Sequence, residues 1–376
     1  MQRSLSALFV VAGVALLSVA ADAQRFGRGS SLTGGNQLMY IGTYAGTVQI
    51  FDEASEQHIG DIKLQTGIPR SLVLSFDKSK FYVLDSTYEK IEIVDVASRR
   101  TLGTFTLSEG NKRARIRSMQ VDPLDRFMIL LSRTATKLVD RWEISDIALE
   151  LYDLREKKIT RTIPWPGGEA REFINIRFSP DGKLLYFFGD DVVILETEKF
   201  TEVDTWALSR PIEQGLGRVS FGAVDDTNDD PGTFTGLFSV QDPVHNRRIM
   251  GIGRVNLAAK SVEFHPIGPS EGMGFAMSPD RKRGYGLLQQ IGRYEFWTFD
   301  LEQKKLLTRQ PFAGRPRMAL RVSSNGRLIY VFQAGATIDI HDASSFKYLR
   351  TIEMTADQTT NLFVLPRPAA TNQTGK

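Results

Sequence analysis

Arginine is the residue type whose spacing in this sequence best suits ligand chemistry. Eight arginines lie between successive predicted sheets or at the start of their first strands: Arg70, Arg113, Arg115, Arg117, Arg171, Arg218, Arg315 and Arg317. A guanidinium group stays charged and binds carboxylate or phosphate through paired hydrogen bonds. If these side chains converge, they predict a positive funnel for an anionic small molecule or an acidic partner. Local pairing with Glu109, Glu169 and Glu172 in solvated linkers is the alternative.

A second cluster combines tryptophan with several charged residues. Residues 132–146 bring together Leu138, Val139, Trp142, Ile144, Arg133, Lys137, Arg141 and Asp146. Exposed tryptophan and arginine are the usual anchors of protein interfaces. The segment therefore predicts docking of another protein, with Trp142 as its anchor. The alternative is a hairpin that extends its own sheet and packs Trp142 inward.

One acidic segment resembles a calcium-binding loop. Asp226, Asn228 and Asp230 place oxygen ligands at alternate positions. Gly232 stands one position late for an EF-hand, and Leu237 occupies the place of its bidentate glutamate. A polar turn is the main interpretation, and calcium is the alternative. The four histidines are too widely spread to predict a zinc or copper site.

Several classes of chemistry have no signal in this chain. It contains no nucleophile elbow, phosphate loop or dinucleotide fingerprint. It has no cysteine, which excludes disulfides, thiolate metal sites and covalently attached c-type haem. The net charge of +3 and the lack of a reading module argue against nucleic-acid binding. These features favour a binding protein over an enzyme, with no covalently bound cofactor.

The elements that must position these residues form a repeat. Seven hydrophobic segments end at or near an acidic or amide residue, and a turn and a short strand-like segment follow each one. The anchor residues are 42 to 60 positions apart: Asp52, Asp95, Asp153, Glu196, Asn256, Asp300 and Asp342. A period near 40 with short strands predicts a β-propeller. Because the acids recur in every repeat, a structural role in a turn explains them better than acid–base catalysis.

Each repeat is interpreted as a four-stranded antiparallel blade, with a turn such as 179–183 (SPDGK) between its first two strands. The first repeat lacks its first strand, and residues 361–366 (NLFVLP) have the character of that strand. The sequence therefore predicts an all-β, seven-bladed propeller closed by its C-terminal strand, which removes exposed sheet edges. Enlarged loops are expected at 132–146 in the third blade and at 225–234 and 242–250 in the fifth.

The start of the chain has the features of a secretory signal. Arg3 precedes an apolar run over residues 8–20 and the small-residue site Ala21-Asp22-Ala23. The run is shorter than the roughly 20 residues that span a bilayer as a helix. The predicted divisions are a signal peptide (1–23), a flexible segment (24–36), the propeller (37–366) and a disordered tail (367–376). We expect a periplasmic or secreted protein with no membrane span after cleavage.

The repeat style resembles a known family of propellers. The motifs that carry the resemblance are VDRWEISDIALELYD (139–153), SPDGKLLYFFGDDVVILE (179–196), GYGLLQQIGRYEFWTFDLE (284–302) and GATIDIHDASSFKYLRTI (335–352). They resemble the β subunit of quinohaemoprotein amine dehydrogenase and the wider YVTN-repeat propellers. In such enzymes the quinone and the catalytic groups belong to a small separate subunit and haem to another, while the propeller is mainly a platform. The resemblance implies a docking role and transfers no catalytic residue.

Together these features predict an exported, non-catalytic propeller that binds a partner protein or ligand. Its binding face is expected to carry the interblade linkers and the turns between second and third strands. One alternative is the propeller subunit of an amine dehydrogenase-like oxidoreductase complex, docked on a redox subunit. Another is a lactonase-like hydrolase that holds a metal in the axial channel.

Overall fold

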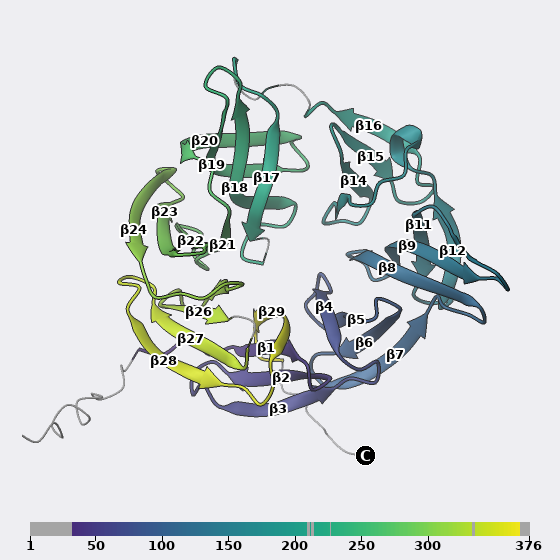
Figure 1. Ribbon diagram of the computed structural model, residues 1–376, viewed down its shortest axis with the longest axis horizontal. Helices are drawn as coiled ribbons and strands as arrows, with labels where there is room; N and C mark the ends of the chain where they lie inside the picture. Colours follow the sequence, from purple (N-terminus) through teal and green to yellow (C-terminus); the bar gives the residue numbers. More distant parts are fainter. Residues whose placement is uncertain (1–31, 209–210, 212–213, 226, 333–334, 369–376) are drawn as a thin grey trace, which may run out of the picture. The chain divides into compact units, whose positions relative to one another are not determined.

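A computed structural model of the chain describes residues 32–368 except 209, 210, 212, 213, 226, 333 and 334. Within these residues the chain forms seven antiparallel sheets arranged as blades in a ring (Figure 1). The helical content of this part of the chain is one short 3-10 turn, η1, at Pro166–Gly168. No helix in the described residues is long and apolar enough to cross a membrane. The predicted all-β, seven-bladed propeller is confirmed.

Each blade is a sheet of at least four strands. In hydrogen-bonded order, blades 1 to 3 contain β29 (Gln358–Leu365), β1 (Leu38–Thr43), β2 (Thr47–Asp52) and β3 (His58–Lys63); β4 (Pro69–Leu74), β5 (Lys80–Asp85), β6 (Lys90–Asp95) and β7 (Arg100–Thr106); and β8 (Lys112–Val121), β9 (Phe127–Lys137), β11 (Ala148–Asp153) and β12 (Lys158–Ile163), with β10 (Trp142–Ile144) also on β9. Blades 4 to 7 contain β13 (Asn175–Phe178), β14 (Leu184–Phe188), β15 (Val192–Glu196) and β16 (Glu202–Trp206); β17 (Val219–Asp225), β18 (Thr233–Asp242), β19 (Arg247–Asn256) and β20 (Ser261–Pro269); β21 (Met273–Met277), β22 (Arg283–Gln290), β23 (Arg293–Asp300) and β24 (Lys305–Pro311); and β25 (Ala319–Val322), β26 (Leu328–Phe332), β27 (Thr337–Asp342) and β28 (Tyr348–Glu353).

The first and last strands of the chain pair with each other. β29 runs antiparallel to β1, with Leu38 opposite Leu365. The predicted closure by residues 361–366 is confirmed, although the strand begins earlier, at Gln358. The pairing completes the four-stranded sheet of blade 1, so that β1 has a hydrogen-bonded neighbour on each side and is not left as an unpaired edge.

The seven anchor residues hold the turn between the third and fourth strands of each blade. Their side-chain oxygens accept hydrogen bonds from backbone amides two or three residues later. Asp300, for example, accepts from the amides of Glu302 at 3.0 Å and Gln303 at 2.8 Å. The fourth residue after each anchor has a positive φ: Glu56, Arg99, Lys157, Phe200, Lys260, Lys304 and Phe346. The structural interpretation of the anchors is confirmed.

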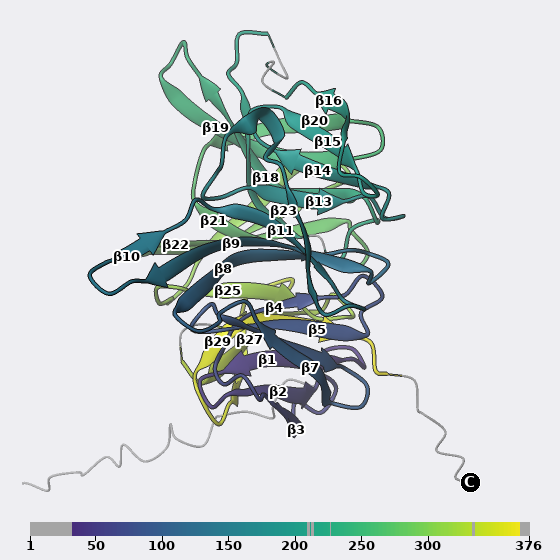
Figure 2. The same ribbon diagram turned by 90° about the vertical axis from the view of Figure 1, so that its right-hand side faces the viewer.

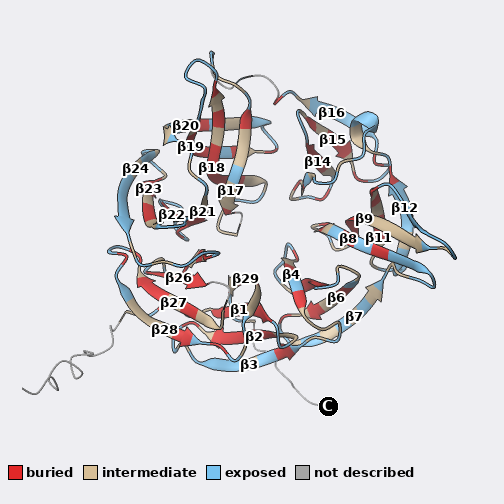
Figure 3. Ribbon diagram, in the orientation of Figure 1, coloured by how far each residue is buried: buried red, intermediate tan, exposed pale blue. Residues whose placement is uncertain are grey.

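The hydrophobic core lies between neighbouring blades. Between blades 7 and 1, Met39 and Ile41 of β1 pack with Leu328 and Tyr330 of β26. Figure 3 shows that inner strands such as β1 and β26 are largely buried, whereas the outer strands β3, β7 and β24 are largely exposed. Because every blade shares its core with its neighbours, the position of each blade depends on the whole ring.

Blade 3 is enlarged by a hairpin. β9 is 11 residues long, and β10 pairs with its far end, where Trp142 lies opposite Lys137. Figure 2 shows β10 projecting beyond the ring. The predicted loop at 132–146 is therefore partly strand, and it does extend its own blade.

Blade 5 is enlarged by longer strands. β18 and β19 are each 10 residues long, and their pairing continues to Asp242 and Arg247, so that only residues 243–246 form the turn. The prediction of a loop over 242–250 is therefore wrong, because the antiparallel ladder persists through most of that segment. The other predicted loop, 225–234, does connect β17 to β18 without regular structure in its described central residues.

Residues beyond the predicted bounds of the propeller also contact the ring. The carbonyl oxygen of Leu32 accepts a hydrogen bond from Arg350 at 2.7 Å. Arg367 forms an ion pair with Asp52 at the end of β2. Part of each segment that was predicted to be flexible or disordered is therefore bonded to the blades. The predicted signal peptide and the end of the predicted tail lie outside the described residues.

Leu362→Ala tests the role of the closing strand. Leu362 is fully buried between blades 7 and 1. Its truncation is expected to lower the free energy of unfolding by about 3 kcal/mol, because it removes buried apolar surface and leaves a cavity. Leu307→Ala on the outer strand β24, where the side chain is 39% exposed, is the matched control. Urea unfolding measures the loss of unfolding free energy in each variant. Equal losses in the two variants would contradict a special role for β29.

Glu196→Gln tests the anchor turn through pH. Hydrogen bonds from the backbone amides of Lys199 and Thr201 lower the pKa of Glu196 to about 2. A carboxylate with a lowered folded pKa stabilises the fold above its unfolded value of about 4.3 and loses this contribution as the pH falls. We expect the variant to be less stable by about 1 kcal/mol at neutral pH. The difference in unfolding free energy between wild type and the variant should narrow as the pH falls from about 4.3 toward about 2.

Urea unfolding at a series of pH values measures this difference. Glu198→Gln, in the same turn, is the control and should show no such narrowing. A gap for Glu196→Gln that stayed constant over this pH range would show that the charge of the anchor does not support the turn.

Candidate functional site

A hollow of about 690 Å³ lies where the inner strands of several blades meet. Its lining comes from blades 1, 2, 3 and 7 and from the segment that leads into blade 4. Segments from so many blades meet only around the axis of a propeller, so the hollow is the mouth of the axial channel. We call it the mouth.

Three of the predicted arginines converge on the mouth: Arg70, Arg117 and Arg317. The Nε atom of Arg70 donates to the hydroxyl of Tyr88 at 2.7 Å, and its guanidinium carbon lies 5.8 Å from the centre of the same ring. Among the described residues, Arg117 and Arg317 form no ion pair or side-chain hydrogen bond. No described residue that lines the mouth is acidic. The three charges therefore reinforce one another in a positive field.

Local backbone irregularities help to place two of these arginines. Along β8 the buried residues Ala114 and Ile116 alternate with exposed arginines, and the register then shifts between Ile116 and Ser118. Arg117 stands at this irregularity, and a bulge re-aims the side chain that it carries. Arg317 has a φ of 63°, in the turn before β25.

Aromatic and hydroxyl groups complete the mouth, and the sequence interpretation missed them. Tyr44 and Phe173 are 62% and 82% exposed. Gln358 Oε1 and Thr359 Oγ1 are buried in its wall without a hydrogen-bond partner among the described residues. Buried polar atoms of this kind are usually satisfied by water or by a ligand. One signal was available, because Thr-Tyr recurs at 43–44 and 87–88 in the same turn of the first two blades.

The remaining predicted arginines do not line the mouth. Arg113 donates to the carbonyl oxygens of Gly110 and Lys112, and Arg218 pairs with Asp190. The other three also lie outside the lining: Arg115, Arg171 and Arg315. Glu172, which the sequence offered as a local partner, pairs with Arg133 at 2.6 Å. The mouth therefore brings together three of the eight predicted arginines, and a binding role for the other five stays a prediction.

The hairpin of blade 3 exposes an apolar patch. Trp142 is 53% exposed, Ile144 is 67% exposed, and Val139 is fully exposed. Arg141 in the same hairpin forms ion pairs with Asp140 and Glu143. The alternative in which Trp142 packs inward is therefore wrong. The hairpin belongs to the connection between the second and third strands, which opens on the same side of a propeller as the interblade linkers.

The predicted calcium ligands are engaged in protein contacts where they are described. The carboxylate of Asp230 forms ion pairs with Arg254 and Arg281. The side-chain amide of Asn228 donates to the carbonyl oxygen of Met277 at 3.3 Å. Asp226 lies outside the described residues. Calcium binding stays a prediction, and it would require Asp230 to exchange two arginine partners for the ion.

His341 is a core residue. Its Nδ1 atom lies 3.0 Å from the carbonyl oxygen of Phe346, and its ring packs against Phe296. Burial lowers the pKa of His341, so the ring is neutral at physiological pH. Among the described residues there is no cluster of three or more histidine or acidic side chains that could hold a metal ion.

Comparison with known proteins finds structures of similar fold but does not assign the chain to a family. Neither a protein-family model nor a curated protein sequence matches the chain. A functionally unknown protein from Desulfotomaculum acetoxidans is similar in structure, with 13% identity, a TM-score of 0.54, and coverage of 89% of this chain and 100% of that one. Dihydro-heme d1 dehydrogenase NirN in complex with DHE gives 11% identity, a TM-score of 0.50, and coverage of 87% and 75%.

Kuenenia stuttgartiensis hydrazine synthase gives 14% identity, a TM-score of 0.47, and coverage of 83% of this chain and 90% of that one. The likeness shows the fold alone. At such identities the activities of these proteins do not transfer to this chain. The resemblance to quinohaemoprotein amine dehydrogenase stays a prediction.

Proposed function

We propose that this chain is an exported, non-catalytic propeller that binds the carboxylate or phosphate group of a ligand or partner protein at its mouth. The observation that carries the proposal is the convergence of Arg70, Arg117 and Arg317 around a hollow without acidic lining residues. Three cations with no compensating carboxylate raise the local concentration of anions and orient them.

The geometry of the lining suits a multiply charged anion. Arg117 and Arg317 are free to form paired hydrogen bonds with a carboxylate or phosphate, because no described protein group occupies them. Arg70 donates a hydrogen bond to the hydroxyl of Tyr88, which holds its guanidinium group in place. Exposed Tyr44 and Phe173 add aromatic surface for the rest of the ligand. Since all three arginines are exposed to solvent, binding should weaken as the salt concentration rises.

An Arg117→Ala/Arg317→Ala double variant tests this proposal. Citrate and inorganic phosphate are the probes, and isothermal titration calorimetry measures their affinities. We expect the double variant to bind citrate at least about tenfold more weakly than wild type, which corresponds to about 1.4 kcal/mol. Raising the salt concentration should weaken wild-type binding in the same assay.

Arg113→Ala is the matched control for this experiment. Arg113 lies on the same strand as Arg117, outside the mouth, and its side chain donates to backbone carbonyl groups. It should bind citrate like wild type. Equal affinities in wild type and the double variant would refute the mouth as the binding site.

A second candidate function is docking of a partner protein on the hairpin of blade 3. The exposed side chains of Val139, Trp142 and Ile144 favour it, because monomeric proteins rarely expose such a patch without a use. Trp142→Ala should reduce recovery of a specific partner from cell extracts of the source organism. Tyr348→Ala removes another aromatic side chain that is 53% exposed, and it should have no effect.

The two enzymatic alternatives predict different bound groups and partners. A propeller subunit of an amine dehydrogenase-like complex would co-purify with a small quinone-bearing subunit and a haem protein. A lactonase-like hydrolase would need metal ligands in the channel, whereas the described lining of the mouth offers guanidinium, hydroxyl and amide groups. Elemental analysis and visible absorption of protein purified from its native cell distinguish these alternatives.

Export is part of the proposal and rests on the sequence of residues 1–23. Cell fractionation followed by N-terminal sequencing tests it. A mature chain that begins after Ala23 in the periplasm or medium would support export, and a cytoplasmic chain that keeps Met1 would refute it.

A further inference from the structure

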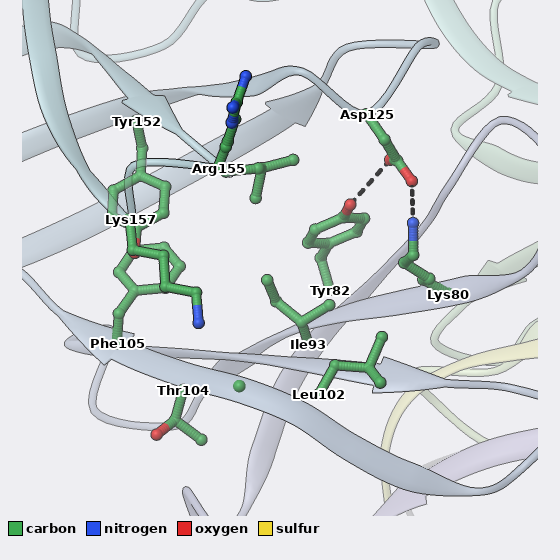
Figure 4. Close-up of a pocket in the computed structure, with 12 residues that line it drawn as sticks. Lys80, Tyr82, Ile93, Leu102, Thr104, Phe105, Asp125, Tyr152, Arg155 and Lys157 are labelled. Atoms are coloured by element: carbon green, nitrogen blue, oxygen red, sulfur yellow. Dashed lines mark hydrogen bonds and ion pairs between the residues drawn. The ribbon is translucent and has the colours of Figure 1, made fainter.

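A second hollow, of about 340 Å³, lies at the outer side of the boundary between blades 2 and 3 (Figure 4). Its floor contains Ile93 and Phe105 from blade 2 and Tyr152 from blade 3. The rings of Phe105 and Tyr152 are stacked with centroids 3.8 Å apart. Leu102 also lines the hollow and is 54% exposed. The volume is at the lower end of the range for small-molecule sites, about 300–1,000 Å³.

The pattern of the anchor turns explains why this boundary is open. In each blade the positive-φ residue lies next to the preceding blade in the ring. Six of the seven make contacts there: Glu56 pairs with Arg350, Arg99 donates to the carbonyl oxygen of Ile59, Phe200 lies under Arg161, Lys260 pairs with Asp204, Lys304 pairs with Glu263, and Phe346 stacks on Phe296. The seventh, Lys157, forms no ion pair or side-chain hydrogen bond with any described residue.

At this boundary Gly103 offers Lys157 no side chain with which to pair. Gly103 lies opposite Ile93, which lies opposite Tyr82, so the three share one row across blade 2. The row ends at Gly103 without a side chain, and a Cβ atom built there would have no atom within 4 Å. In blade 4 the corresponding residue beside the bulge is Asp204, which pairs with the next blade. In blade 2 this space stays open.

The charged side chains around the hollow differ in whether they have an ion-pair partner. Lys80 forms an ion pair with Asp125, and Asp125 also accepts a hydrogen bond from the hydroxyl of Tyr82 at 2.8 Å. The positive charge of Lys80 is therefore balanced by the carboxylate of Asp125. Lys157 and Arg155 have no such partner among the described residues. Figure 4 shows the ammonium group of Lys157 pointing toward the space between Phe105 and Ile93.

We propose that this hollow is a binding site for a small aromatic carboxylate. The apolar ring system would lie on Ile93, Leu102 and Phe105, where it buries surface that is now exposed to water. The carboxylate would pair with Lys157, with Arg155 at the rim adding to the positive field. Such a ligand takes the place that a side chain of the neighbouring blade fills at other boundaries. The proposal is independent of the mouth.

The probe for this site is 2-naphthoate, and the neutral 2-naphthylmethanol is its uncharged counterpart. Calorimetry and ligand-observed NMR measure both. We expect saturable binding of 2-naphthoate to the full chain, with weaker binding of the alcohol. Lys157→Gln should weaken 2-naphthoate at least about tenfold, a loss of about 1.4 kcal/mol, and leave the alcohol unchanged. Lys158→Gln, at the next position and already paired with Glu156, should bind like wild type.

Gly103→Leu is the second test, because it fills the hollow from an ordinary strand conformation. It should abolish binding of both probes while the melting temperature is retained or raised. Gly268→Leu is the matched control, since Gly268 is also on an outer strand and its Cβ position is also open. The proposal fails if 2-naphthoate does not bind at millimolar concentration or if Gly103→Leu binds it normally. It also fails if the double variant of the mouth, rather than Lys157→Gln, removes binding.

Discussion

Closure of the ring is the constraint on which the rest of this structure depends. β29 and β1 lie at opposite ends of the chain, and their pairing places blade 7 against blade 1. The buried carboxylate of Glu53 reinforces the junction, because it accepts hydrogen bonds from the amide of Ser324 at 2.7 Å and the hydroxyl of Tyr330 at 3.1 Å. The mouth exists only in the closed ring. Arg317 of blade 7 and Arg70 of blade 2 approach each other across blade 1, so opening that blade would disperse the field between them.

Within the closed ring, the anchor turn recurs in every blade, with a different side chain at its positive-φ position. Every anchor turn has a positive-φ residue four positions after its anchor, and in six of the seven blades that residue contacts the preceding blade. An acid at that position, as in Glu56, forms an ion pair across the boundary, and an aromatic ring, as in Phe346, extends the core. Lys157 faces Gly103 and does neither. The backbone therefore fixes where blades can be joined, and the side-chain pair decides whether a given boundary is closed or open.

The sequence revealed the fold because its strongest signal is local. The anchors determine the number of blades, and the missing first strand of blade 1 predicts the closure by residues 361–366. The site was only partly predictable. Whether an arginine lies at the axis depends on the stagger of blades far apart in sequence, which is why Arg117 lines the mouth and Arg218 pairs locally with Asp190. The hollow at Gly103 could not be predicted, since it is made by the absence of a side chain at an interblade contact.

The same turn chemistry also explains how a nearly neutral chain has a strongly positive mouth. Antiparallel blades place the turns after their first and third strands on one face and the remaining connections on the other. The turns of the first face need carboxylates as hydrogen-bond acceptors, as at Asp181 and Asp300. The acids of these turns therefore lie away from the mouth. The net charge of +3 therefore does not describe the mouth, whose described lining has three arginines and no acid.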